Sequence, residues 1–434
     1  MTTARDRTVA LLAEWTPIRS VAGEPAEKRR MAKAVASRLS ALGGRIVADG
    51  FALDPPVVHA RFDRGHATTI LLYNMYDVMP ADEAGWSVPP FTGGIADIGF
   101  GPSYVARGAE NNKGPLAGML VALEDLLPTL DANVEVVIEG EEETGSAGVR
   151  RYLASGTVRR CTAALFPSFC EYGGGPPRIY LGTKGIGHGR ISIAGGDWGG
   201  PARAIHSSNI PWIDNPAWAL VQTLARLTEG PNGRLGRVPL PEDARPVLAN
   251  LAAMFDPAAE LRFRATQRYA IPGDVATLLE TVMCEASLNL ATLASDPPDG
   301  RAVIPHAAEA RFDLRVPPGW YLDATLAALR ASLPEGADLL LEDAYPGHRF
   351  PAAAPGVAAL VSAYRAAGID PQIWPWSIGA MPACAFAGVA DSVLLGGLGR
   401  GGNAHGPDEF VTLEGIDRFI ASLLAWLPAI AAAP

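Results

Sequence analysis

Short β-branched runs alternate with helical patterns along the first part of the chain, and this rhythm restricts the fold more than any other feature. The runs ATTILLYNMYDV and VEVVIEGEEE are typical of strands, whereas LAGMLVALEDLL between them and VRRYLASG after them are typical of helices. Alternation of this kind builds βαβ units. The pattern therefore predicts an α/β domain.

A second pattern interrupts this rhythm from about residue 184 to residue 345. Its elements are strand, helix, strand, strand, helix and strand, with a stretch rich in Pro, Gly and charged residues after the first helix. This is the element order of a ferredoxin-like α+β sandwich. Because the βα alternation then resumes, we expect one domain in two parts, 1–183 and 346–434, with a second domain, 184–345, inserted between them.

Composition and charge argue against several classes of protein. The chain has 434 residues, 48% of them hydrophobic, so it can bury cores for two domains. Its net charge of −10 comes from interspersed acids without a basic tract, so we expect no nucleic-acid partner. The apolar segment 419–434 contains Pro428 and is shorter than the roughly 20 residues of a membrane span, so we expect a packed helix. Four cysteines without CxxC pairing fit a reducing cytoplasm.

A run of three glutamates, residues 141–143, follows a predicted strand. Acids at the carboxyl end of a parallel strand lie where open α/β sheets place their ligands. Adjacent carboxylates point in different directions, so one can hold a metal while its neighbour acts on a water as general base. The competing interpretation is a solvated charge run that caps a helix. His405, in the loop GRGGNAHGPDEF, is likewise either a ligand or a surface residue.

Six short motifs follow one another in a fixed order: NMYDVMPA, WSVPPF, ARGAENNKGPLAG, EGEEETGS, IHSSNIPWIDNP and GGNAHGPDEF. In this order they resemble the M20 family of metallopeptidases and amidohydrolases, which includes dipeptidases, N-acyl amino acid deacylases and glutamate carboxypeptidases. The resemblance covers essentially the whole chain. It implies a mixed-sheet, zinc-exopeptidase-like catalytic domain and an inserted lid domain through which two chains form a homodimer.

The resemblance also implies a role for each matching residue in catalysis. Glu142 would be the general base, and Glu143 and His405 would be ligands of the same metal. His206, in the inserted domain, would donate a hydrogen bond to the oxyanion, which in such enzymes often happens across a dimer.

Three further positions match residues that line the substrate pocket. Asn289 in SLNLAT and Arg315 in DLRVPPG match positions that grip a substrate carboxylate, a task suited to the planar fork of arginine. Gly379 in SIGAMP matches a glycine turn of the same pocket. The competing interpretation is that Asn289 caps a strand end and that Arg315 pairs with an acid on the sheet surface. We expect a small-molecule substrate with a free carboxylate.

Three metal-ligand positions of the family pattern hold neutral residues in this chain. Met75 stands where the pattern has a histidine, Asn111 replaces an aspartate that bridges two metals, and Ser168 lies near the position of a third acid. The residue after the bridging position, here Asn112, is joined through a cis peptide in the family. Asp77, which would normally hydrogen-bond the missing histidine, is retained.

These losses argue against a pair of metal ions. Two dications about 3.5 Å apart repel each other by roughly 19 kcal/mol at an effective dielectric near 20, and anionic ligands must offset this repulsion. We therefore expect no binuclear zinc centre. Two expectations remain for the metal content. One is a single zinc ion held by Glu143, His405 and the amide oxygen of Asn111, although three such donors make a poor site. The other is no metal at all.

The sequence thus predicts a hydrolase of an amide bond, in a peptide or an N-acyl amino acid, with Glu142 as general base. One alternative is a metal-independent enzyme of the same fold that uses Cys170 as nucleophile or performs acid/base lyase or acyl-transfer chemistry. Another is a non-catalytic binder of small molecules. Against the first, a free cysteine is most often a small buried residue. The sequence does not identify the acyl group or the amino acid of the substrate.

Overall fold

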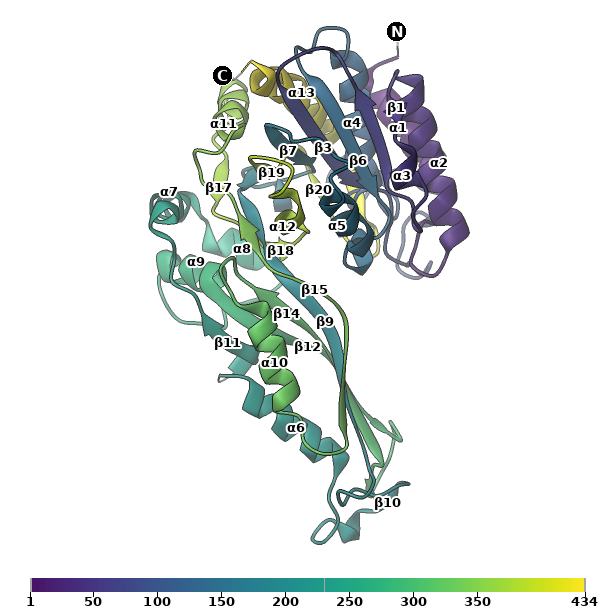
Figure 1. Cartoon of the computed structure of the whole chain (residues 1–434), viewed down its shortest axis with the longest axis vertical. Helices are drawn as coiled ribbons and strands as arrows, with labels where there is room; N and C mark the ends of the chain where they lie inside the picture. The colour runs from purple at the N-terminus through teal and green to yellow at the C-terminus, as the bar shows by residue number, and fades with distance from the viewer. Residues whose placement is uncertain (1, 230, 433–434) are drawn as a thin grey trace.

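The computed structural model describes residues 2–229 and 231–432 and divides into two domains (Figure 1). The upper domain in the figure carries both ends of the chain, and the lower domain is elongated. The helices are α1 (Ala4–Trp15), α2 (Pro25–Ala41), α3 (Ala48–Phe51), α4 (Lys113–Leu126), α5 (Ala147–Ala154), α6 (Pro216–Leu227), α7 (Arg245–Met254), α8 (Pro257–Phe263), α9 (Val275–Cys284), α10 (Leu322–Ala331), α11 (Val357–Ala366), α12 (Ala383–Phe386) and α13 (Leu413–Ala431).

The upper domain is built on an eight-stranded mixed sheet. Its strands are, in spatial order, β1 (Arg45–Ile46), β2 (Val58–Phe62), β6 (Asn133–Glu139), β3 (Thr69–Met75), β7 (Ala163–Pro167), β19 (Val393–Gly396), β8 (Arg178–Tyr180) and β17 (Gln372–Trp374). Strand β3 pairs in parallel with both β6 and β7, whereas β2 pairs with β6 in antiparallel fashion. The predicted α/β catalytic domain with a mixed sheet is confirmed.

Burial explains why the central strands read as nearly continuous apolar runs. Every residue of β6 and β7 is buried, because helices cover both faces of the sheet. Helix α4 is buried around most of its circumference and packs between α1 and α13. Among the helices of residues 2–229 and 231–432, none combines the length and the apolar character needed to cross a membrane.

The lower domain contains a second sheet whose strands order as a ferredoxin-like fold. Its strands are, in spatial order, β11 (Arg234–Arg237), β12 (Glu285–Asp296), β14 (Ala307–Val316), β9 (Gly182–Ala194) and β15 (Ala337–Tyr345). Buried and partly exposed residues alternate along β14, and helices α6 and α10 supply Leu220 and Leu326 to the core under this sheet. Strand β9 is long enough to cross from one domain to the other.

Eight short strands complete the fold and include those that hold the histidine loop. They are β4 (Gly94–Asp97), β5 (Pro102–Val105), β10 (Ile205–His206), β13 (Val303–Ile304), β16 (His348–Arg349), β18 (Ser377–Ala380), β20 (Gly401–Gly402) and β21 (Phe410–Thr412). Strands β20, β21, β5 and β4 form a separate sheet, and the loop between β20 and β21 carries His405.

Three helices, α7 to α9, occupy the stretch that the sequence analysis interpreted as a Pro-, Gly- and charge-rich excursion. Helices α7 and α9 pack around Trp374 and Trp376. Glu260 of α8 pairs with Arg178 of β8 at 2.5 Å. The side chain of Asp256 caps the start of α8, and that of Asp274 caps the start of α9. These capping residues resemble loop residues when they are read without their structural context, and the helices were missed for this reason.

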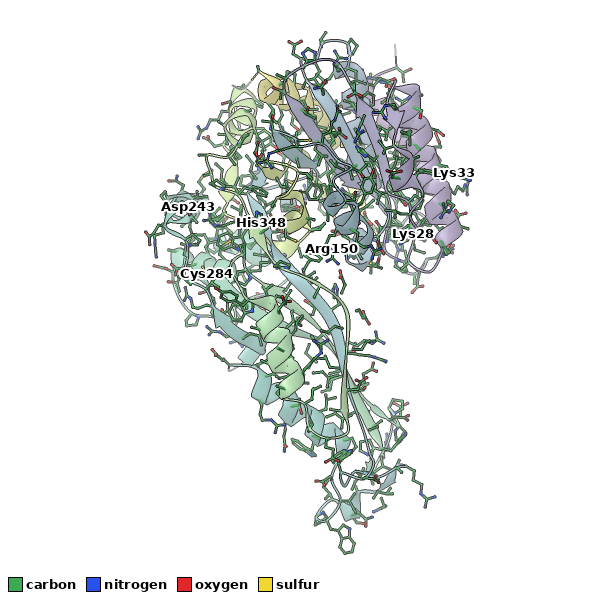
Figure 2. All side chains as sticks on the ribbon, in the orientation of Figure 1. Lys28, Lys33, Arg150, Asp243, Cys284 and His348 are labelled. Carbon is green, nitrogen blue, oxygen red and sulfur yellow. The ribbon has the colours of Figure 1, made fainter. Side chains whose placement is uncertain are left out.

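Ion pairs connect the two domains at their junction. Arg150 of α5 pairs with Asp343 of β15, and its guanidinium carbon lies 5.0 Å from the centre of the Tyr345 ring. Arg349 pairs with Asp243 at 2.6 Å. Figure 2 shows Arg150, Asp243 and His348 along this junction. These contacts join the two domains at their junction.

Candidate active site

A cavity of about 550 Å3 lies between the two domains, at the carboxyl ends of β3, β6 and β7. The upper domain contributes Met75, Glu110, Asn111, Glu142, Glu143, Ser168 and His405 to its lining. The lower domain contributes Ile186, His188, Arg315 and Tyr345. The structure therefore brings most of the residues singled out in the sequence to one place.

Asp77 holds the backbone of Glu142 and Glu143 in position. After β6 the chain enters a short 3-10 turn, Glu142–Thr144. The buried Asp77 carboxylate accepts the backbone N–H of Glu142 at 3.2 Å and that of Glu143 at 3.1 Å. Burial raises the pKa of Asp77 to about 7. Asp77 thus orders the glutamate turn, although Met75 has replaced the histidine it would otherwise support.

Three side chains converge at the position proposed for a single metal. Asn111 Nδ2 lies 2.9 Å from Glu143 Oε1 and 3.0 Å from His405 Nε2, and His405 Nε2 lies 3.2 Å from Glu143 Oε1. The hydrogen bond to Glu143 raises the pKa of His405. The peptide bond between Asn111 and Asn112 is cis, as the resemblance implied.

A buried ion pair ties the Asn111 segment to the histidine loop. Arg107 Nη1 donates to Glu409 Oε2 at 2.6 Å. The same carboxylate accepts the backbone N–H groups of Gly108 at 3.0 Å, Glu110 at 2.9 Å and Asn111 at 2.8 Å. Because charge-assisted hydrogen bonds of this kind are strong, Glu409 fixes Asn111 relative to the loop that carries His405.

The pKa of the Glu142 carboxyl group lies well above that of an exposed glutamate. Burial is the main cause that raises its pKa well above the usual range, and the neighbouring carboxyls of Glu143 and Asp77 add to the effect. Arg315, on the opposite wall, lowers the pKa. A group in this environment can give or take a proton once a substrate or a cation changes its surroundings.

The donor set does not fit two metals. Met75, Ser168 and Asn111 all line the cavity, and all three are neutral. Thioether, hydroxyl and amide groups cannot offset the charge of a second dication. Within residues 2–229 and 231–432, no group of three or more His, Cys, Asp or Glu side chains is arranged to hold a metal ion. Glu143 and His405, with the Asn111 amide, are the residues that would hold one.

Arg315 and Gly379 line the cavity, but Asn289 does not. Asn289 Nδ2 donates to Asp313 Oδ1 at 2.8 Å, and Arg315 Nε donates to Asp313 Oδ2 at 3.1 Å. Within a single chain Asn289 therefore lies outside the cavity, with its amide nitrogen bonded to Asp313, and its role in gripping a substrate stays a prediction. Arg315 pairs with a sheet acid, as the competing interpretation stated, and still faces the cavity.

His206 lies far from the cavity of its own chain. It is exposed on β10, at the tip of the lower domain opposite the catalytic domain (Figure 1). Its Nδ1 accepts the backbone N–H of Ser208 at 3.2 Å. An oxyanion role for His206 therefore requires a second chain.

Cys170 is a poor candidate for a nucleophile. Its side chain is completely buried and lies outside the cavity lining. Burial raises the pKa of the thiol to about 12, so the reactive thiolate is strongly disfavoured at neutral pH. The burial of the thiol therefore argues against the cysteine alternative.

Among the cavity residues that the sequence analysis missed, Glu110 and His188 have side chains that can carry a proton. Glu110 immediately precedes Asn111, and burial raises its pKa to about 8, with Glu409 adding to the effect. His188 of β9 pairs in register with Asp313 of β14 and lies on the same face of the sheet as Ile186. The adjacent motif could have revealed Glu110, whereas His188 depends on strand register.

We expect Glu110→Gln to stabilise the metal-free protein at alkaline pH. In the folded chain Glu110 keeps its proton up to about pH 8, whereas its ordinary pKa is 4.5. Between these values the unfolded chain has lost a proton that the folded chain retains, so the free energy of unfolding falls as pH rises. The substitution removes this loss of stability, which amounts to as much as roughly 5 kcal/mol above pH 8.

Denaturant unfolding of chelator-treated protein at several pH values measures this effect. Glu83→Gln, at an exposed glutamate, is the matched control and should leave the pH dependence unchanged. Identical pH profiles for wild type and Glu110→Gln would contradict the assignment.

The mixed sheet, the inserted ferredoxin-like domain and the cavity between them define a two-domain peptidase fold. The family model described as "Peptidase family M20/M25/M40" matches residues 71–428. The chain belongs to this family.

Two curated relatives are similar over part of the chain. The Cys-Gly metallodipeptidase dug1 of Schizosaccharomyces pombe is 30% identical over 190 residues, which are 42% of this chain and 38% of that protein. The human Beta-Ala-His dipeptidase is 33% identical over 165 residues, 33% of this chain and 32% of that protein. The matches therefore span well under half the length of these relatives.

Solved structures share the fold over the whole chain. The M20 family metallo-carboxypeptidase Sso-CP2 from Sulfolobus solfataricus superposes with a TM-score of 0.86 and 23% identity, and the match covers 99% of this chain and 100% of that one. The dipeptidase Dug1p from Saccharomyces cerevisiae gives a TM-score of 0.81 at 20% identity, with 98% and 96% covered.

Proposed function

We propose that this protein hydrolyses an amide bond, in a dipeptide or an N-acyl amino acid, within a small substrate that carries a free carboxylate. One observation carries the proposal: a single cavity holds Glu142 on the catalytic wall and Arg315 on the lid wall. The dipeptidase activities named for the two partial relatives support the reaction type.

Each cavity residue then has a task. Arg315 binds the substrate carboxylate with the part of its guanidinium that Asp313 does not use. Glu142 takes a proton from the attacking water and delivers it to the leaving nitrogen. A single zinc ion held by Glu143, His405 and Asn111 would supply a water of lowered pKa. We propose at most one such ion, because the neutral side chains at Met75, Asn111 and Ser168 do not fit two.

We also propose a homodimer formed through the lower domain. Exposed apolar side chains gather on α6 and β12 of that domain: Trp218, Val221, Leu290 and Leu293. Strand β11 pairs with β12 only over residues 285–287, so the rest of this edge of β12 is free within the described chain. A second copy on this surface would cover these side chains. His206 of each chain could then act in the catalytic cavity of the other chain.

We propose that the protein is located in the cytoplasm.

A metal-free enzyme or a binder is the second candidate, and one observation favours it. Asn111 Nδ2 donates to Glu143 Oε1, and His405 Nε2 either accepts from Asn111 or donates to Glu143, so part of this donor set is already hydrogen-bonded within the chain. Activity that chelators abolish would favour the one-metal hydrolase, chelator-resistant activity would favour metal-free chemistry, and tight binding without turnover would favour the binder.

Arg315→Gln is expected to raise the KM for carboxylate-bearing substrates by about 10- to 150-fold, because a charge-assisted hydrogen bond contributes about 1.5–3 kcal/mol. Steady-state kinetics on dipeptides and N-acetyl amino acids measures the change. The same substrates with an amidated carboxyl group should respond little. Arg311→Gln, on the same strand outside the cavity, is the matched control. An unchanged KM in Arg315→Gln would remove the carboxylate grip from the proposal.

A further inference from the structure

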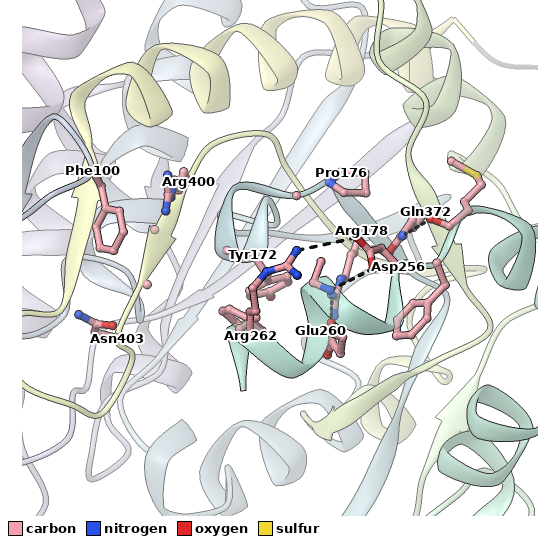
Figure 3. A pocket seen from close by; sticks show the side chains of 18 of the residues that line it. Phe100, Tyr172, Pro176, Arg178, Asp256, Glu260, Arg262, Gln372, Arg400 and Asn403 are labelled. Carbon is pink, nitrogen blue, oxygen red and sulfur yellow. Dashed lines mark hydrogen bonds and ion pairs between the residues drawn. The ribbon is translucent and has the colours of Figure 1, made fainter. Parts of the chain in front are cut away.

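A second cavity, of about 420 Å3, lies between helix α8 and strand β20 (Figure 3). It shares Tyr172 with the catalytic cavity. The two cavities also use consecutive parts of one segment, since residues 400–403 line the second cavity and residues 404–405 line the catalytic one. None of the residues given a catalytic role above lines the second cavity. Its volume is in the range of small-molecule sites.

One end of this cavity presents the guanidinium of Arg400. The guanidinium of Arg400 lies over the ring of Phe100 at 4.3 Å, and Gly174 leaves room for it, since a Cβ there would approach to 3.3 Å. Arg400 forms no ion pair within the described part of the chain, and its buried Nε has no hydrogen-bond partner there. The carboxylate of the nearby Glu171 already forms an ion pair with Arg418. A planar guanidinium held in this way suits a carboxylate.

The other end presents an acceptor without a donor. Gln372 is only 3% exposed, and its Nε2 donates to the backbone oxygen of Met254 at 3.1 Å. Its Oε1 has no partner among residues 2–229 and 231–432. A buried acceptor of this kind is costly unless a donor reaches it. Figure 3 places Arg400 and Gln372 on opposite sides of the cavity.

Apolar side chains lie between these two polar ends. Phe100, Met254 and Phe263 belong to the small set of large apolar side chains that are about 40% exposed, and all three line this cavity. The ring of Phe100 also stacks on that of Phe410, with centroids 4.8 Å apart. Their convergence suits a flat apolar body that covers them.

We propose that this cavity binds a small aromatic carboxylate with a hydrogen-bond donor at the far end of its ring. The carboxylate pairs with Arg400, and the ring lies among the aromatic side chains. The donor bonds Gln372 Oε1, which requires the buried Gln372 side chain to turn toward the cavity. This site goes beyond the proposed amide hydrolysis, and its test measures binding, so either proposal can fail without the other.

Isothermal titration of the 434-residue chain with 3-(4-hydroxyphenyl)propionate tests the site. We expect 3-phenylpropionate, which lacks the donor, and 4-ethylphenol, which lacks the carboxylate, to bind at least about fivefold more weakly. Arg400→Gln should weaken the first ligand by at least about tenfold and should hardly affect 4-ethylphenol.

Two variants on α8 keep the test independent of Arg400. Ala259→Phe fills the cavity and should abolish binding, whereas Ala258→Phe, at an exposed neighbour outside the lining, should retain it. Arg315→Gln should also retain it, because Arg315 lines only the catalytic cavity. Binding that survives both Arg400→Gln and Ala259→Phe, binding lost in Arg315→Gln, or no binding at millimolar ligand would overturn the proposal.

Discussion

Glu142→Gln is expected to lower kcat/KM for amide hydrolysis by about 100- to 10,000-fold, the usual contribution of a general base. Glutamine has nearly the same shape and keeps the backbone N–H bonds to Asp77, but it cannot accept a proton from water. The measurement is the rate of release of free amino acid from a panel of dipeptides and N-acetyl amino acids.

Glu141→Gln is the matched control for this experiment. Its carboxylate accepts the backbone N–H of Gly148 at 2.7 Å and lies outside the cavity lining. Glutamine retains an oxygen for that bond, so activity should stay near that of the wild type. Equal rates for wild type and Glu142→Gln would remove Glu142 from the mechanism.

Restoring the missing ligands should create a second metal site. The triple variant Met75→His, Asn111→Asp and Ser168→Asp adds an imidazole and two carboxylates on one wall of the cavity, next to Glu143 and His405. Anionic and imidazole donors of this kind are what a pair of dications requires. We expect the triple variant to bind two equivalents of zinc per chain, measured by elemental analysis after dialysis.

The single variant Met79→His provides a control, because Met79 also lines the cavity but lies outside the altered ligand positions. It should leave the metal content unchanged. If a correctly folded triple variant bound no more zinc than the wild type, the neutral residues at these three positions would not be what limits zinc binding.

The sequence predicted much of the fold because the spacing of apolar residues along the chain reflects which side chains are buried. The continuous apolar runs of β3, β6 and β7 reflect strands covered on both faces. Helices α7 to α9 were missed because their Asp caps and Pro residues read as loop signals. The sequence analysis could assign the three altered ligand positions to one site because members of a family share a fold. Motifs that match those of the family therefore lie at the same places in the structure.

Other features of the site depend on three-dimensional context. The burial of Cys170, which disfavours its thiolate, results from packing between distant segments. Strand register sets Asp313 beside Asn289 and opposite His188. The distance of His206 from its own cavity follows from the length of the lower domain. Single-sequence patterns do not encode these relations.

The metal content of the purified wild-type protein tests the central claim most directly. That claim is that neutral side chains at Met75, Asn111 and Ser168 leave too little negative charge for two dications. Elemental analysis after incubation with excess zinc and dialysis should find at most one equivalent per chain. Two tightly bound equivalents per chain would contradict the account.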